Sequence, residues 1–188
     1  MSIEARAPWA GILLAISTSA NPLQAQATLT QQEALAAAFP RASEIERRTA
    51  FLSEADQVAA RDLAGPGVEV SQSVVTYYVG KTDSELLGYA YFDSHRVRTL
   101  PEVLMVVVSP ADEIVGIEVL RFSEPPEYRP PGGWLERFAG HRLAKELSLK
   151  GSIDAITGAT LTSSAVTDAV RRVLAIHSII ERSHEGVQ

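Results

Sequence analysis

The chain has 188 residues, a formal net charge of −6 and no cysteine. This length suits one domain with its own core, and the acidic balance argues against a nucleic-acid partner. The lack of cysteine excludes disulfides, iron–sulfur clusters and cysteine-attached haem, and the four histidines show no ligand spacing, so no metal site is predicted.

The first 27 residues resemble a secretory signal peptide. Residues 7–20 are small and apolar, Pro22 follows, and Ala25-Gln26-Ala27 has the spacing of a cleavage site. The apolar run is shorter than the roughly 20 residues that span a bilayer. We therefore expect export, cleavage before Thr28, and one domain over residues 28–188 in the periplasm or another extracytoplasmic space. The alternative is a cytoplasmic protein with an apolar start.

Two helices are predicted next. Thr30 can cap a short alanine-rich helix that Pro40 ends, and Ser53 can cap a second helix through residue 63. Gly65-Pro66-Gly67 stops the second helix. The mixed residues 41–52 between them are expected to run extended.

The central part of the chain reads as strands. Residues 68–79 are rich in Val, Thr and Tyr, and residues 87–96 place Tyr89, Tyr91 and His95 at two-residue spacing. Residues 103–108 are continuously apolar, and residues 114–122 follow a turn. Residues 80–85 form a further predicted turn. Four consecutive strands joined by turns predict an antiparallel meander. The expected fold is α+β, a twisted antiparallel sheet packed with helices.

A stiff loop is predicted over residues 123–133, which hold four prolines and two glycines. Trp134 follows it, and its ring can either stack on a planar cofactor or anchor the core. Residues 142–149 are expected to form a short helix.

The segment from Asp154 to Ser163 is rich in hydroxyl groups and leads into a long helix predicted over residues 164–184. A helix N-terminus offers unpaired N–H groups and a partial positive charge that suit a phosphate. The simpler interpretation is an ordinary N-cap after a glycine turn. His177 falls within the apolar pattern of the helix and is expected to be packed there.

The spacing Asp-x-x-Thr-Gly-Ala-Thr, from Asp154 to Thr160, resembles the flavinylation motif of the FMN-binding domain family. That family includes the small flavin-carrying subunits of the sodium-translocating NADH:quinone oxidoreductase and of the Rnf complex. The resemblance implies FMN bound covalently to Thr160 through a phosphoester. It also implies a separate flavin transferase that uses FAD as the donor. Asp154 would either be recognised by this transferase or brace the turn.

Further cofactor contacts follow from the same interpretation. In the family a loop of the pattern Glu-Thr-Pro-Gly lies against the flavin, and here Glu124 and one proline match it. The residues expected to surround the cofactor are Thr157, Gly158, Ala159, Thr162, Ser163, Glu124 and Trp134, with Thr160 as the attachment point.

The sequence therefore predicts an exported electron carrier that works between a membrane redox donor and an extracytoplasmic acceptor such as a cytochrome. It contains neither a Gly-x-Gly-x-x-Gly fingerprint nor a Gly-x-Ser-x-Gly elbow, which argues against a stand-alone enzyme. The alternatives are a binding or sensing module, or a scaffold subunit, that keeps the fold without covalent flavin. The rest of the Pro-rich loop departs from the family pattern, which keeps these alternatives open.

Overall fold

The computed structural model describes residues 29–185, so the predicted leader and its cleavage point lie outside the described residues. Four α-helices and a five-stranded antiparallel sheet occur within this range, which confirms the predicted α+β fold. The elements are α1 (Gln31–Ala38), β1 (Glu44–Phe51), α2 (Glu54–Ala64), β2 (Val74–Lys81), β3 (Leu86–Arg96), β4 (Pro101–Val108), β5 (Ile114–Phe122), η1 (Pro126–Tyr128), α3 (Gly132–Leu135), η2 (Glu136–Phe138) and α4 (Thr160–Glu185).

The sheet is a meander in which each strand pairs with the next, in the order β1-β2-β3-β4-β5. The extended segment expected over residues 41–52 is β1, which pairs with β2 and makes the sheet one strand wider than predicted. The strand predicted over residues 68–79 instead begins at Val74. Val68 and Val70 are buried beside α2 without joining the sheet. The turn predicted over residues 80–85 is shorter than expected, because β2 continues to Lys81.

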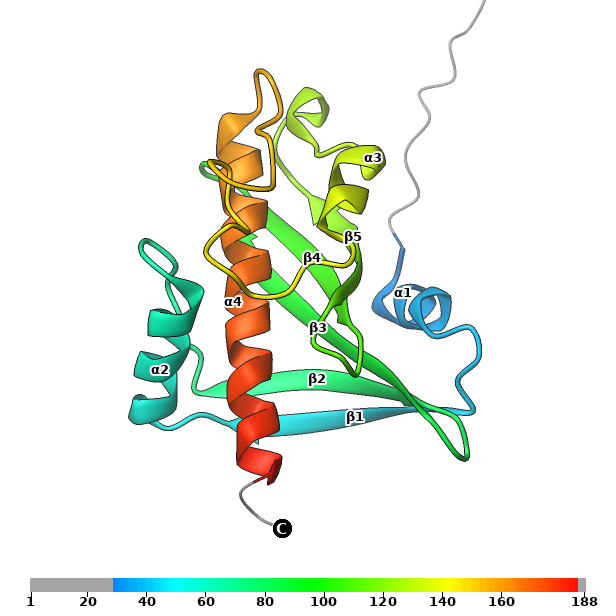
Figure 1. The fold of residues 1–188 in the computed structure, drawn as a ribbon. Coiled ribbons are helices and arrows are strands. Elements are labelled where there is room, and N and C mark those ends of the chain that lie inside the picture. The colour runs from blue at the N-terminus through cyan, green and yellow to red at the C-terminus, as the bar shows by residue number, and fades with distance from the viewer. Residues whose placement is uncertain (1–28, 186–188) are drawn as a thin grey trace, which may run out of the picture.

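Helices α4 and α2 cover one face of the sheet, and α1 packs on the other (Figure 1). The N-caps of both short helices are confirmed, because Thr30 and Ser53 each accept a backbone hydrogen bond from the third helical residue. Each such cap stabilises a helix by about 1 kcal/mol. Among residues 29–185 no helix is long and apolar enough to cross a membrane.

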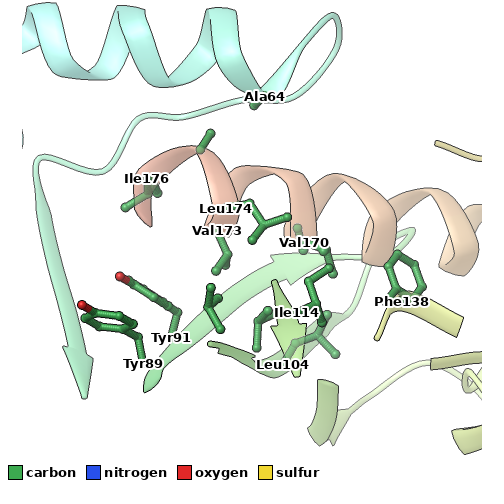
Figure 2. Close-up of a cluster of buried hydrophobic side chains, with 14 of the residues drawn as sticks. Ala64, Tyr89, Tyr91, Leu104, Ile114, Phe138, Val170, Val173, Leu174 and Ile176 are labelled. Carbon is green, nitrogen blue, oxygen red and sulfur yellow. The ribbon is translucent and has the colours of Figure 1, made fainter. Parts of the chain in front are cut away.

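The main core lies between α4 and the sheet. Figure 2 shows Val170, Val173 and Leu174 of α4 pointing toward the sheet, where they meet aromatic and aliphatic side chains. These three side chains are at most 3% exposed, and burial of each contributes about 1.5–3 kcal/mol. The long C-terminal helix is therefore the main cover of this sheet face.

His177 is packed inside this core, as predicted. Its ring is fully buried, with Nδ1 2.8 Å from the Tyr91 hydroxyl and Nε2 3.1 Å from Asp112 Oδ1. Burial lowers the pKa of His177, although Glu181 and Asp112 act in the opposite direction. The imidazole thus serves as a hydrogen-bonded core group.

Two helix predictions need correction. Residues 142–149 form turns rather than a helix, held by carbonyl contacts such as the hydrogen bond from Leu147 N–H to the Ala144 oxygen (3.2 Å). Helix α4 begins at Thr160, four residues earlier than predicted. Thr160 is therefore the first residue of the helix rather than part of the turn before it.

Candidate functional site

A tight turn precedes α4. The N–H of Ala159 donates to the carbonyl oxygen of Ile156 (3.0 Å), which closes a four-residue turn with Gly158 in its third position. Gly158 has φ +81°, the left-handed conformation that a type II turn requires at this position. A glycine is thus needed here for its backbone, since a Cβ would meet nothing within 4 Å.

The hydroxyl of Ser163 connects this turn to the first turn of α4. It accepts a hydrogen bond from Ile156 N–H (2.9 Å) and donates one to the carbonyl oxygen of Ala159 (3.0 Å). Ser163 is fully buried and Thr162 is 1% exposed. Of the hydroxyl residues predicted at the site, these two are therefore enclosed by protein.

Thr160 lies on the surface at the beginning of α4. The backbone N–H groups of Thr160, Leu161 and Thr162 have no hydrogen-bond acceptor among residues 29–185. These groups carry the positive end of a 26-residue helix, which attracts an anion. An exposed alcohol is thus placed beside donors that suit a phosphate.

A cavity of about 200 Å³ adjoins this helix end. Its walls combine the end of the turn, the β3–β4 connection and the Pro-rich loop, and they are lined by Val97, Arg98, Glu124, Tyr128, Gly158, Ala159, Thr160, Leu161 and Thr162. Ligand pockets usually measure about 300–1,000 Å³. A flavin held here would therefore be only partly enclosed, and Arg98 is the cationic residue of the cavity lining.

Glu124 shapes one wall of this cavity. Its Oε1 accepts hydrogen bonds from the backbone N–H groups of Arg98 (3.3 Å), Thr99 (2.9 Å) and Leu100 (2.9 Å). These bonds, first those from Thr99 and Leu100, lower the pKa of the Glu124 carboxyl. The carboxylate thus holds the turn that presents Arg98, while the residue itself borders the cavity.

Trp134 and Asp154 lie behind the turn rather than in the cavity. Trp134 is 7% exposed, packs edge-on against Phe138, and donates from Nε1 to the Asp154 carbonyl oxygen (2.7 Å). The Asp154 carboxylate accepts from Arg137 Nη2 (2.6 Å). Trp134 could have stacked on a cofactor or anchored the core, and in the structure it is packed in the core. Asp154 braces the start of the motif segment.

A buried ionic cluster flanks the β3–β4 connection. The Arg172 guanidinium donates to both carboxylate oxygens of Asp93 (2.7 and 2.8 Å). The His95 ring bridges Asp93 (2.9 Å) and Glu102 (3.1 Å). Burial by itself would raise the pKa of Asp93, but the hydrogen bonds from Arg172 and His95 outweigh it and lower the pKa. This cluster holds together the strand ends from which Val97 and Arg98 project.

The structure thus brings most of the predicted residues to one place. Gly158, Ala159, Thr160, Thr162 and Glu124 border one cavity, whereas Trp134 and Ser163 support it from within and Thr157 is exposed on the turn. Sequence reasoning missed four cavity residues, which are Val97, Arg98, Tyr128 and Leu161. Tyr128 could have been found from the sequence, because it is the one aromatic residue of the Pro-rich loop over residues 123–133. Among residues 29–185 no group of three or more His, Asp or Glu side chains is placed to hold a metal ion.

Two comparisons with known proteins bear on the family that this chain resembles. Residues 101–175, which include β4, β5, the Pro-rich loop and the turn, match the model of the FMN-binding domain. The chain is also 27% identical over 166 residues to a subunit of the Na⁺-translocating ferredoxin:NAD⁺ oxidoreductase complex of Acetobacterium woodii. That alignment covers 82% of this chain and 75% of the relative. These two matches confirm the resemblance to the FMN-binding domain family that the motif predicts.

Proposed function

We propose that this protein is an electron carrier whose FMN is esterified through its phosphate to Thr160. The main support is the position of Thr160, an exposed alcohol at the beginning of α4 beside three N–H groups without acceptors among the described residues. A phosphodiester keeps one negative charge, and a helix N-terminus stabilises such a charge by about 0.3–1 kcal/mol or more. Arg98 adds a positive charge at the same cavity.

In this proposal the chain orients the cofactor, and the carboxylate in the cavity wall, Glu124, is engaged by three backbone N–H groups. Bound FMN supplies the redox chemistry, while the protein supplies attachment, orientation and electrostatics. The cavity walls from Val97 and Tyr128 provide apolar and aromatic surface against which a planar ring can rest. Because the cavity is small, it would leave part of a bound flavin uncovered for a redox partner.

Attachment requires a second protein. A threonine hydroxyl is a weak nucleophile and needs a general base. We propose that a flavin transferase supplies the base and binds FAD. The Thr160 oxygen then bonds to the phosphorus on the FMN side of the diphosphate, the bridging P–O bond breaks, AMP leaves, and the base takes the hydroxyl proton.

The relative from Acetobacterium woodii is named as part of a Na⁺-translocating oxidoreductase complex. We propose by analogy that this carrier accepts electrons from a membrane redox donor and delivers them to an extracytoplasmic acceptor such as a cytochrome. This assigns the domain to the periplasm or another extracytoplasmic space, after removal of residues 1–27. The apolar residues 7–20 and Ala25-Gln26-Ala27 support export.

The test is co-expression with a flavin transferase. The intact mass should rise by one FMN less one water, flavin absorbance should survive acid precipitation of the protein, and peptide mapping should place the adduct on Thr160. Protein from a host without the transferase is the control and should be colourless. An adduct on Thr157 or Thr162 would contradict the assignment. A colourless protein from the competent host would favour a binding, sensing or scaffold module instead.

A further inference from the structure

Ser163 has a buried hydroxyl that contacts both ends of the turn before Thr160. Its oxygen accepts from the N–H of Ile156, the first residue of the turn, and donates to the carbonyl of Ala159, the last. The turn's own bond from Ala159 N–H to Ile156 oxygen (3.0 Å) closes the same ring of groups. One hydroxyl thus uses its donor and one acceptor position to fix four residues against α4.

We propose that Ser163 is a positioning residue for flavin attachment, which sets the direction of the Thr160 hydroxyl without touching the flavin. This inference rests on the proposed function. Ser163 is fully buried, whereas Thr160, three residues earlier on α4, is exposed. A serine at this point can therefore act on the reaction only through the backbone it holds.

The backbone between the two residues explains the effect. The Ala159 carbonyl is the acceptor for both the Ser163 hydroxyl and the Ser163 N–H (3.0 Å each), so this peptide group is fixed by two bonds. The next residue along the chain is Thr160. Removal of the hydroxyl leaves Ile156 N–H without its acceptor and frees the start of the turn, so that Thr160 samples more orientations. A misplacement of about 1 Å can reduce the rate of a reaction by about 100-fold.

The transferase should still recognise the unchanged motif in a Ser163→Ala chain. The loss should therefore appear in the turnover number rather than in the Michaelis constant. We expect kcat for flavin transfer to fall by about 10- to 100-fold, with a change in KM of less than about threefold. Ser163→Thr keeps the hydroxyl and should restore kcat.

Ser178→Ala is the matched control. Ser178 lies on the same helix and also donates its hydroxyl to a carbonyl four residues earlier, that of Leu174 (3.0 Å). It accepts no hydrogen bond from a turn among the described residues. Flavin transfer to this variant should equal that to the wild type. Equal loss in both variants would mean that any helix hydroxyl matters and would overturn the proposal.

Amide hydrogen exchange on the unmodified protein provides a readout that needs no flavin. In Ser163→Ala the Ile156 amide should exchange at least about tenfold faster, while amides in the middle of α4 keep their protection. Unchanged exchange at Ile156, or wild-type kcat in Ser163→Ala, would refute the inference. If wild-type protein takes no flavin but the exchange result holds, then the proposed function fails and the structural role of Ser163 stands.

Discussion

The buried cluster around His95 makes the stability of this protein depend on pH in a defined direction. Burial by itself would lower the pKa of His95, but hydrogen bonds to Asp93 and Glu102 outweigh it and raise the pKa from 6.5 to about 9. The side chain is 10% exposed, so solvent screens these contacts little. One unit of pKa shift corresponds to about 1.36 kcal/mol. The difference between the folded and unfolded pKa of His95 therefore stabilises the folded state by about 3 kcal/mol.

The sign follows from the raised pKa. The stabilisation is fully present below pH 6.5, where the unfolded chain also carries a protonated His95, and it is lost as the pH rises toward and through about 9. Loss of the proton removes the positive charge that His95 places between Asp93 and Glu102, while Arg172 remains paired with Asp93. Burial also raises the pKa of Asp168, which Arg172 and Arg171 oppose.

The assay is chemical denaturation between pH 6 and pH 10 of wild type and His95→Gln, with His184→Gln as a control outside the cluster. The difference in unfolding free energy between wild type and His95→Gln should shrink by about 2–3 kcal/mol between pH 7 and pH 10. The difference in unfolding free energy between wild type and His184→Gln should stay constant over the same pH range. A constant difference, or an NMR titration of the His95 ring near 6.5, would refute the reasoning.

Three further predictions concern the attachment segment and the leader. Thr160→Val should abolish covalent flavin but cost less than about 1.5 kcal/mol of stability in thermal unfolding, because the side chain is exposed; stoichiometric flavin that survives denaturation of this variant would end the proposal. Gly158→Val should lower the melting temperature through strain at φ +81° and should hold little flavin in absorbance measurements, whereas wild-type stability would rule out that strain. Protein made with its own leader should begin at Thr28 in N-terminal sequencing, and an intact Met1 on cytoplasmic protein would contradict export.

Local sequence signals predicted some elements well. Strand β5 has the predicted bounds, since a turn precedes it and the prolines of the loop follow it. The edge strand β1 has four charged residues among its first five, Glu44, Glu46, Arg47 and Arg48. This composition predicts only an extended segment, and its place in the sheet comes from pairing with β2. Charged residues are common on edge strands because they discourage pairing with other chains.

The buried contacts that hold the site in place could not be predicted from local sequence. Asp93 and Arg172 are 79 positions apart, and only the packing of α4 on β3 brings them together. The early start of α4 has a similar cause. Thr and Ser are weak helix formers in isolation, but here Thr162 and Ser163 are enclosed by the fold and the Ser163 hydroxyl bonds back to Ala159. Tertiary contacts therefore override the local preference of the hydroxyl residues.

The position of α4 after all the strands has a consequence for biosynthesis. All five strands leave the ribosome before the helix that covers them, so the apolar face of the sheet stays open until about residue 180 has been made (Figure 1). Thr160 belongs to that last element, and the hydrogen bonds that hold the preceding turn include those made by Ser163 of the same helix. On the proposed function, flavin attachment at Thr160 would therefore follow folding, and chains truncated within α4 should be cleared as unfolded protein.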